Sequence, residues 1–442
     1  MCGNFRLLSF GVNPFQYLSL QQSISESGMR SISTRYVNLF LLILAGEMIF
    51  ALPFHITRFF RPTFIEALNL TNTQLGDAFA IYGITAMICY FPGGYVADRV
   101  PAKNLIITSL VTTALGGLFL STLPDPFELG LLYGFWGITT ILFFWAALIK
   151  AAKVWGGELS QGKAFGFLEG GRGLAAALFT TTIFYFFFSG QEISVLDTDS
   201  RKSTIQQISI VYAMCLFVIA ILFSFFYKPE CSTAIMNPSK KSKLKKFNPL
   251  LSSKVWFLSI VVLCAYCGYK SLDNIGLFLQ EGWGWSEVGA AGFTTIMSYI
   301  RPFTAIIAGI AVDYISPLKS IKLLFFLLSI SSILLTYFSP SNIILWLLIA
   351  NVILSFLVVY AIRSIYFSLM APCNFPQNKI GAVVGIVSVI GFTPDIFFAS
   401  VTGRILDQNP GLIGHQNYYL ALFAIAVLGI LSSLKLSKLI KV

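Results

Sequence analysis

Two short stretches of the sequence each place a carboxylate and a basic side chain three residues apart. GFLEGGRG carries Glu169 and Arg172, and YCGYKSLDN carries Lys270 and Asp273. At this spacing the two groups lie on one face of a helix and can neutralise each other. Such a pair can also be opened, because an anion competes for the basic group and the released carboxylate then gains affinity for a proton. The spacing therefore leaves two interpretations: a structural ion pair, or a site that binds an anion and a proton.

The elements that carry these pairs are apolar enough to lie in a membrane. The chain of 442 residues is 56% hydrophobic and only 11% charged, against roughly 25% charged in soluble domains. Its mean hydropathy is +0.78, and its apolar runs of about 20 residues match the length of a membrane-spanning helix. An ionised group at the centre of such a helix costs about 2.5 to 3.5 kcal/mol, so these groups must face a cavity or one another.

Other basic residues in apolar stretches are candidates for binding an anion. Arg301 has no acid close to it in its own stretch, so it needs a partner from elsewhere, and we expect it to be the main anchor. Arg172, Lys270 and Arg363 are further candidates for substrate binding. For Arg363 the alternative is a side chain that extends toward the membrane surface.

Four carboxylates are candidates for proton coupling: Glu47, Glu169, Asp273 and Asp395. Asp395 follows Pro394, which frees backbone groups within a span. For Glu47 the alternative is a buried structural hydrogen bond.

Apolar runs and breaks predict an all-α membrane protein with twelve spans in two six-helix halves. We expect an N-terminal segment (1–35), a first half (36–227), a basic linker (228–254) and a second half (255–442). The predicted spans are residues 37–59, 74–96, 104–123, 129–150, 164–188, 207–227, 255–279, 287–312, 321–338, 343–369, 379–402 and 418–438.

Basic residues predict the orientation. If the N-terminus is cytoplasmic, most of the 30 basic residues fall on the inside and both termini lie there, as the positive-inside rule requires. The linker stretch KKSKLKK and the net charge of +11 then serve as a topology signal rather than a nucleic-acid site. The basic residues expected outside are Arg58, Arg61, Arg201, Lys202 and Arg404.

The two halves repeat a short motif between their second and third spans. GYVADRVPAK follows span two and GIAVDYISPLK follows span eight, and in each an aspartate comes four residues after a glycine. The glycine permits close backbone approach, the aspartate favours a helix N-terminus, and the basic residue can bind last-turn carbonyls. We expect a conformational gate, with solvated turn residues as the alternative. The predicted gate residues are Gly94, Asp98, Arg99, Lys103, Gly309, Asp313 and Lys319.

At these residues the sequence resembles the major facilitator superfamily, whose first half carries Gly-x-x-x-Asp-Arg-x-x-x-Lys/Arg at this place and whose second half carries a weaker copy. The resemblance covers almost the whole chain after residue 35, although Tyr314 replaces the arginine in the second copy. WAALIKAAKVWGG, KAFGFLEGGRGL and GFTPDIFFASVTGRILD look most similar to bacterial carriers of the sugar-phosphate and organic-anion branch. The resemblance implies transport by alternating access.

Together these observations predict a secondary transporter of a small organic anion in the cell membrane, driven by protons and acting as a single chain in the lipid bilayer. The alternative is a proton-driven exporter of drugs or metabolites with the same fold, whose cavity would carry fewer charges. An enzyme is disfavoured because the chain has only 2 histidines and no nucleotide or metal motif. We therefore expect no cofactor, metal or nucleic-acid partner; substrate identity and direction stay open.

Overall fold

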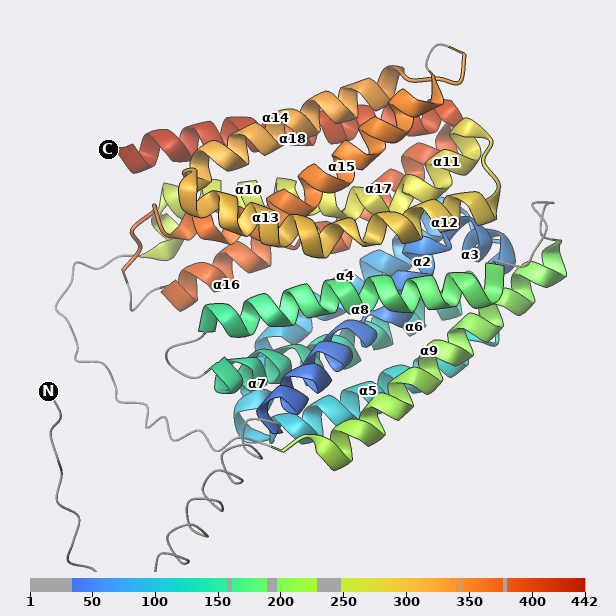
Figure 1. The fold of residues 1–442 in the computed structure, drawn as a ribbon, viewed down its shortest axis with the longest axis horizontal. Helices are drawn as coiled ribbons and strands as arrows, with labels where there is room; N and C mark the ends of the chain where they lie inside the picture. Colours follow the sequence, from blue (N-terminus) through green and yellow to red (C-terminus); the bar gives the residue numbers. More distant parts are fainter. Residues whose placement is uncertain are drawn as a thin grey trace, which may run out of the picture.

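A computed structural model describes residues 34–156, 161–188, 197–228, 248–341, 344–376 and 380–441. In these ranges the regular elements are all helices, and they form two bundles that lie side by side (Figure 1). The first bundle contains the helix Thr34–Met48, η1 (Ala51–His55), α2 (Ile56–Phe59), α3 (Arg61–Leu68), α4 (Asn72–Arg99), α5 (Ala102–Leu120), α6 (Pro126–Ile138), η2 (Thr139–Trp145), α7 (Ala146–Gly156), α8 (Gln161–Phe188) and α9 (Thr198–Phe226).

The second bundle follows the segment that joins the halves. It contains η3 (Pro249–Leu251), α10 (Ser253–Ser271), η4 (Leu272–Asn274), α11 (Ile275–Trp283), α12 (Glu287–Ser298), α13 (Ile300–Tyr314), α14 (Pro317–Tyr337), α15 (Leu345–Ile365), η5 (Tyr366–Met370), α16 (Ile380–Gly391), α17 (Pro394–Gln408) and α18 (Leu412–Lys441).

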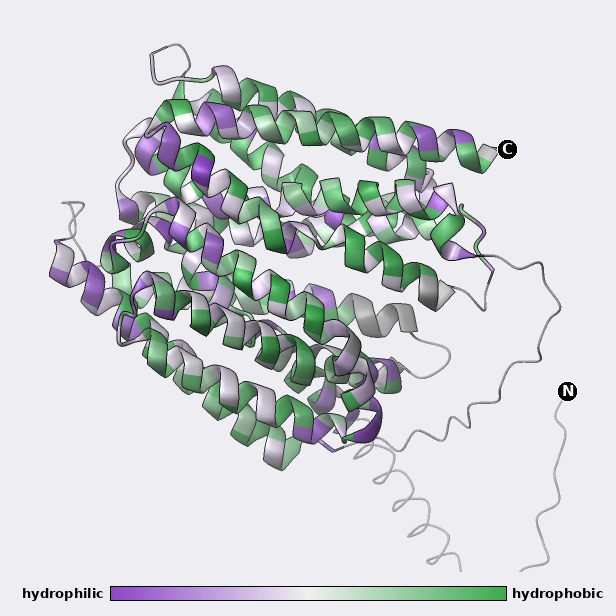
Figure 2. Cartoon of the chain, turned by 180° about the vertical axis from the view of Figure 1, so that it is seen from behind, coloured by the Kyte–Doolittle hydropathy of each residue, from purple (hydrophilic) through white to green (hydrophobic). Residues whose placement is uncertain are grey.

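The described helices agree with the predicted membrane protein. Ten are long and apolar enough to cross a membrane, and there are up to twelve if each of two bent pairs counts as one span. Hydrophobic residues predominate along most of the helix length, and hydrophilic residues are more frequent near the helix ends (Figure 2). The predicted start of the sixth span is late: α9 begins at Thr198, where the Asp197 side chain accepts a hydrogen bond from the Ser200 backbone amide at 2.9 Å.

Two spans are interrupted near the candidate ionisable residues. The first bends by 42° between Thr34–Met48 and the helix Ala51–Phe59, and its second part starts with the π-helical turn η1. The seventh passes from α10 through the 3₁₀ turn η4 into α11. Such turns within a helix often lie at functional sites, because they redirect side chains and free backbone groups.

The two halves are in close contact at one end of the bundle. We call this end the Asn72 face, after the first residue of α4, and the opposite end the linker face, after Lys228 and Asn248 on either side of the linker. Toward the Asn72 face α4 packs against α17 and α8 against α12. The backbones approach so closely that a Cβ added at Gly76 would lie 2.4 Å from the carbonyl oxygen of Ala399.

Toward the linker face the two halves diverge (Figure 1). A Cβ added at Gly94 or at Gly309 would meet no atom within 4 Å. Within the described residues, the hydrogen bonds and ion pairs that join the halves lie between the middle of the bundle and the Asn72 face.

Candidate functional site

A first cluster of charges is built around Glu47, at the end of the first helix. Its carboxylate accepts hydrogen bonds from His55 Nε2 and from Arg172 Nε, each at 3.1 Å. Arg172 Nη1 also donates to Glu169 at 2.7 Å. From the other half, the Arg301 guanidinium lies 3.7 Å from the Glu47 carboxylate and 3.5 Å from that of Glu169. Two carboxylates and two guanidiniums therefore balance one another across the boundary between the halves.

A second cluster surrounds the break in the seventh span. Asp273, in η4, accepts a hydrogen bond of 2.5 Å from Arg58 Nε of the first half. Lys270 lies 3.9 Å from Asp273 and only 3.2 Å from Asp395, at the start of α17. The ammonium group of Lys270 also faces the ring of Phe54 at 4.7 Å. Here too, two carboxylates balance two basic groups.

Two tyrosines of α10 connect the second cluster to Arg363. The Tyr266 hydroxyl lies 3.0 Å from both carboxylate oxygens of Asp395, and the Tyr269 hydroxyl accepts a hydrogen bond of 2.7 Å from Arg58 Nη1. The guanidinium of Arg363 stacks over the ring of Tyr269 at 3.7 Å and lies 5.7 Å from that of Tyr266.

Arg363 differs from the other basic residues of the site. Its Nη1 is buried and has no hydrogen-bond partner among the described residues, and no carboxylate of those residues lies within 4.0 Å of it. A buried donor without a partner costs about 1 to 3 kcal/mol, and more for a charged group. This guanidinium is therefore available to an anion.

The charged groups of the first cluster differ in exposure. The Glu169 side chain is 49% exposed, whereas those of Glu47 and Arg172 are 4% and 9% exposed. Glu169 is therefore the most accessible charged group of the cluster, since the Arg301 side chain is 13% exposed.

The structure brings the eight predicted substrate and proton residues together in the middle of the molecule. The Glu169 and Arg172 pair forms as the spacing predicts, and Arg301 has its partners in the other half, as its lack of a local acid requires. The pair of Lys270 and Asp273 is present, but each has a closer partner elsewhere. Their roles in binding and proton coupling stay predictions.

Sequence reasoning missed four side chains of the site: His55, Arg58, Tyr266 and Tyr269. Arg58 was expected on the outer side, near the end of the predicted span 37–59. It lies in α2, but its side chain is only 12% exposed because it pairs with Asp273 of the other half. Since the first span is bent and contains the π-helical turn η1, counting helical turns from Glu47 does not place Arg58. Arg61 is likewise buried, in α3.

The predicted gate residues make no described contact between the halves. The Arg99 guanidinium lies over the ring of Tyr95 in its own helix, at 3.3 Å, and the Asp98 side chain is exposed. Lys103 donates a hydrogen bond of 2.6 Å to the carbonyl of Ser224, in the last turn of α9, as its position in the motif predicts. Lys319 is exposed, and the side chain of Asp313 lies outside the described residues.

Contacts at the Asn72 face take the form that the gate motif predicts. Asp407 accepts hydrogen bonds from the backbone amides of Asn72 and Thr73, at 3.0 and 2.6 Å, and so caps the N-terminus of α4 from the other half. Arg404 donates to Asp77 at 2.8 Å. Asp407 follows Gly403 by four residues, the same spacing that separates Gly94 from Asp98 and Gly309 from Asp313.

Residues 43–399 match the model of the Major Facilitator Superfamily. The chain belongs to this superfamily. It is 28% identical over 398 residues to the inner membrane protein YqcE of Escherichia coli. The aligned region covers 87% of this chain and 91% of YqcE. It is 27% identical to the inner membrane protein YihN of the same organism, over 90% of this chain and 94% of YihN. The chain is thus a multi-pass membrane transporter of the superfamily and not an enzyme.

Solved structures share the fold at low sequence identity. A bacterial homologue of the human lysosomal transporter Spinster, in an inward-facing and unoccupied conformation, matches with a TM-score of 0.71 and 14% identity, over 92% of this chain and 98% of that chain. A crystal structure of the D-xylose-proton symporter matches with a TM-score of 0.69 and 16% identity, over 92% and 97% of the two chains. This likeness concerns the architecture, and the chemistry of the site must be argued from its own residues.

Proposed function

We propose that this superfamily transporter moves a small organic anion across the cell membrane, that protons drive it, and that it works as a single chain with both termini in the cytoplasm. The observation that carries the proposal is the guanidinium of Arg363, whose Nη1 is buried without a hydrogen-bond partner and which has no carboxylate partner among the described residues.

The charge balance of the site supports an anionic substrate. The carboxylates of Glu47, Glu169, Asp273 and Asp395 are matched by the basic groups of Arg58, Arg172, Lys270 and Arg301. Arg363 then adds one uncompensated positive charge. Because an unpaired charge is costly in a low-dielectric interior, closing the molecule around an empty site is unfavourable and closing it around an anion is less so. In an exporter of lipophilic cations, the uncompensated positive charge of Arg363 would repel the substrate.

Arg172 and Arg301 supply the proposed link to protons. Both are bound to Glu169, the most exposed carboxylate of the first cluster. An anion that attracts these guanidiniums weakens their hold on Glu169, and a carboxylate that loses a positive partner binds a proton more readily. Substrate and proton would therefore favour each other's binding, as symport requires.

The contacts between the halves support alternating access. With both termini in the cytoplasm, the Asn72 face is the outer end, and the described contacts would hold that end shut. The proposed role of Gly94, Asp98, Arg99, Lys103, Gly309, Asp313 and Lys319 is to close the opposite end in the other state. Arg99 and Lys103 have partners inside their own half in this state, so they would have to rearrange or act as supports.

Thermal stability of the purified protein tests the anion specificity. A ligand that binds the folded state stabilises it by mass action, by about 2.7 kcal/mol at one hundred times its Kd. We expect at least one of D-gluconate, D-glucose 6-phosphate and L-lactate to raise the melting temperature of the wild type and not that of Arg363→Gln. Lys202→Gln, which changes an exposed basic residue of α9, is the matched control and should respond like the wild type.

Stabilisation by tetraphenylphosphonium alone, retained in Arg363→Gln, would instead support the exporter. An anion response that persists unchanged in Arg363→Gln would contradict the proposed role of this residue.

A further inference from the structure

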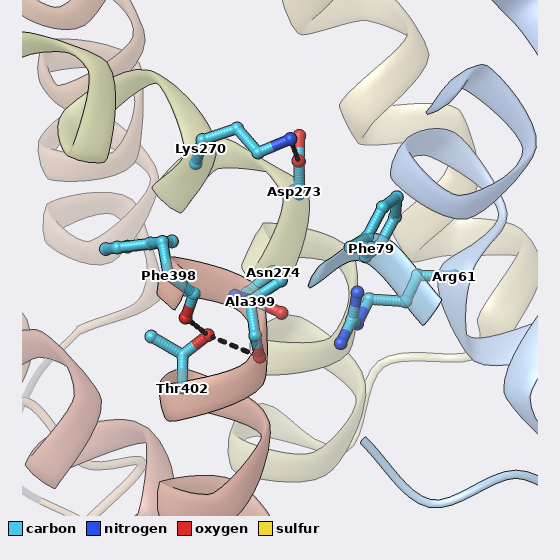
Figure 3. A pocket seen from close by; sticks show the side chains of 8 residues that line it. All are labelled: Arg61, Phe79, Lys270, Asp273, Asn274, Phe398, Ala399 and Thr402. Carbon is cyan, nitrogen blue, oxygen red and sulfur yellow. Dashed lines mark hydrogen bonds and ion pairs between the residues drawn. The ribbon is translucent and has the colours of Figure 1, made fainter. Parts of the chain in front are cut away.

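Arg61 carries a second guanidinium near the break in the seventh span, at a cavity that Lys270 and Asp273 also line. A small cavity with a volume of about 10 Å³, room for about one water molecule, lies between the two halves of the molecule. Figure 3 shows the side chains that line it, with Arg61 and Phe79 coming from the first half and the others from the second. The lining residues are Arg61, Phe79, Lys270, Asp273, Asn274, Phe398, Ala399 and Thr402.

Arg61 and Asn274 each have one polar atom without a hydrogen-bond partner among the described residues at this cavity. The residue is 4% exposed, and its Nη2 donates to the amide oxygen of Asn72 at 3.1 Å. Its Nε has no hydrogen-bond partner, and no described carboxylate lies within 4.0 Å of the guanidinium. Asn274 is also 4% exposed, and its Oδ1 has no partner among the described residues. The cavity thus offers a charged donor and a neutral acceptor.

The order of residues along the seventh span separates this cavity from Arg363. Arg363 contacts Tyr266 and Tyr269 of α10, whereas the cavity of Arg61 is lined by Asp273 and Asn274, about one helical turn further along the chain. Lys270 and Asp273 also line the cavity, so their ion pairs with Asp395 and Arg58 adjoin it, whereas Arg363 is not among the lining residues. Two guanidiniums without carboxylate partners among the described residues therefore lie at two different places along the seventh span.

We propose that Arg61 is a second anion-binding residue, which holds the transported anion when the molecule opens toward the Asn72 face. The inference rests on the proposed anion transport and adds a second anion-binding position, which we call the second station. Arg61 Nε would donate to an oxygen of the anion, and Asn274 Oδ1 would accept a hydrogen bond from a hydroxyl group on the same molecule. The ligand class is therefore a hydroxylated organic anion, such as a sugar acid, a sugar phosphate or a hydroxy acid.

The helices that close the Asn72 face also control the size of this cavity. Phe79 belongs to α4, and Phe398, Ala399 and Thr402 belong to α17. These two helices are in backbone contact at Gly76 and Ala399. When they separate, the walls move apart, and the space beside Arg61 becomes connected to solvent. In the closed arrangement it has room for water alone, so Arg61 acts in the other state.

Transport measured from each face tests the second station. Right-side-out and inverted membrane vesicles would take up labelled D-gluconate, D-glucose 6-phosphate or L-lactate, whichever stabilises the wild type. Loss of one charge-assisted hydrogen bond predicts that Arg61→Gln raises KM at the Asn72 face about tenfold to a hundredfold. At the linker face KM should stay near the wild-type value, and Arg61→Lys, which keeps the charge, should restore part of the affinity.

The comparison of the wild type with Arg61→Gln separates the two proposals. If none of the three anions stabilises or enters with the wild type, the proposed anion transport is contradicted, and the second station with it. If an anion is transported and Arg61→Gln leaves KM unchanged at both faces, or raises it equally at both, the second station is overturned while anion transport stands. The amount of each variant in the membrane is measured by immunoblot, and Arg61→Lys carries the test if Arg61→Gln fails to accumulate.

Discussion

Glu47 is the residue on which the first cluster depends, because it faces three donors from three different elements. His55, Arg172 and Arg301 all approach its carboxylate, and the side chain is 4% exposed. Glu169 shares two of these partners, but its side chain is 49% exposed. Two carboxylates in the same cluster are therefore expected to differ in what they contribute, since water can replace the partners of one and not of the other.

Neutral replacements of the two glutamates test this difference. Glu47→Gln leaves Arg172 and Arg301 buried with one carboxylate between them, and breaking a buried pair in this way costs about 3 to 5 kcal/mol. Glu169→Gln removes a half-exposed partner, for which a loss of about 0 to 1 kcal/mol is expected. Thermal unfolding of the two purified variants and the wild type in the same detergent shows which variant loses more stability. Equal losses would contradict the burial argument.

At the scale of the element, the α4 and α17 pair shows how one short sequence pattern works at a helix end. Gly403 lets α17 reach the backbone of Asn72, where an added Cβ would lie 2.4 Å from the Asn72 carbonyl oxygen. Asp407, four residues later, then accepts hydrogen bonds from the first two backbone amides of α4. The same glycine-to-aspartate spacing at Gly94 and Gly309 supports the proposed gate at the linker face, where the helices are apart in this state.

Loss of the Asp407 cap should shift the molecule toward the state that is open at the Asn72 face. A capping side chain contributes about 0.5 to 2 kcal/mol relative to alanine, so Asp407→Ala is expected to raise the population of that state by about twofold to thirtyfold. The readout is the rate at which a membrane-impermeant maleimide, added from the Asn72 face, labels a cysteine placed at Phe398 in a background without the seven native cysteines.

Asp125→Ala is the matched control for this experiment. Asp125 also caps a helix, since it accepts a hydrogen bond of 2.9 Å from the backbone amide of Glu128, but both residues belong to the first half. Its replacement should leave the labelling rate unchanged. An equal increase in both variants would mean that the effect comes from general loosening rather than from the contact between halves.

The sequence predicted the spans well and their interruptions poorly. Long apolar runs identify a membrane helix from local composition, so each predicted span overlaps a described helix. The π-helical turn η1 and the 3₁₀ turn η4 depend on packing between helices that are distant in the chain, and no local pattern reveals them. The burial of Arg58 was missed for a related reason, because it depends on the contact with Asp273, which lies 215 residues away in the sequence.

At the scale of the whole molecule, the charged residues form two patterns, one among the spans and one in the loops. Balanced ion pairs at the centre lower the cost of burying charge, and the positive-inside rule predicts that the basic residues of the linker set the orientation of the chain. The two patterns are independent, because the first depends on contacts between the halves and the second on the loops alone. Replacing Arg363 should therefore change binding without changing topology.

Topology can be tested at two described positions on opposite faces. The positive-inside rule predicts that the end carrying Asn248 and the basic linker is cytoplasmic, and Ser341, between α14 and α15, then lies outside. Alkaline phosphatase is active only outside the cytoplasm, so a fusion after Ser341 should be active and a fusion after Asn248 should not; green fluorescent protein at the same two positions should give the reverse. If the phosphatase fusion were active after Asn248, the linker would lie outside and the Asn72 face would point to the cytoplasm. The closed end of the molecule would then be the inner one, and the proposed direction of opening toward Arg61 would reverse with it.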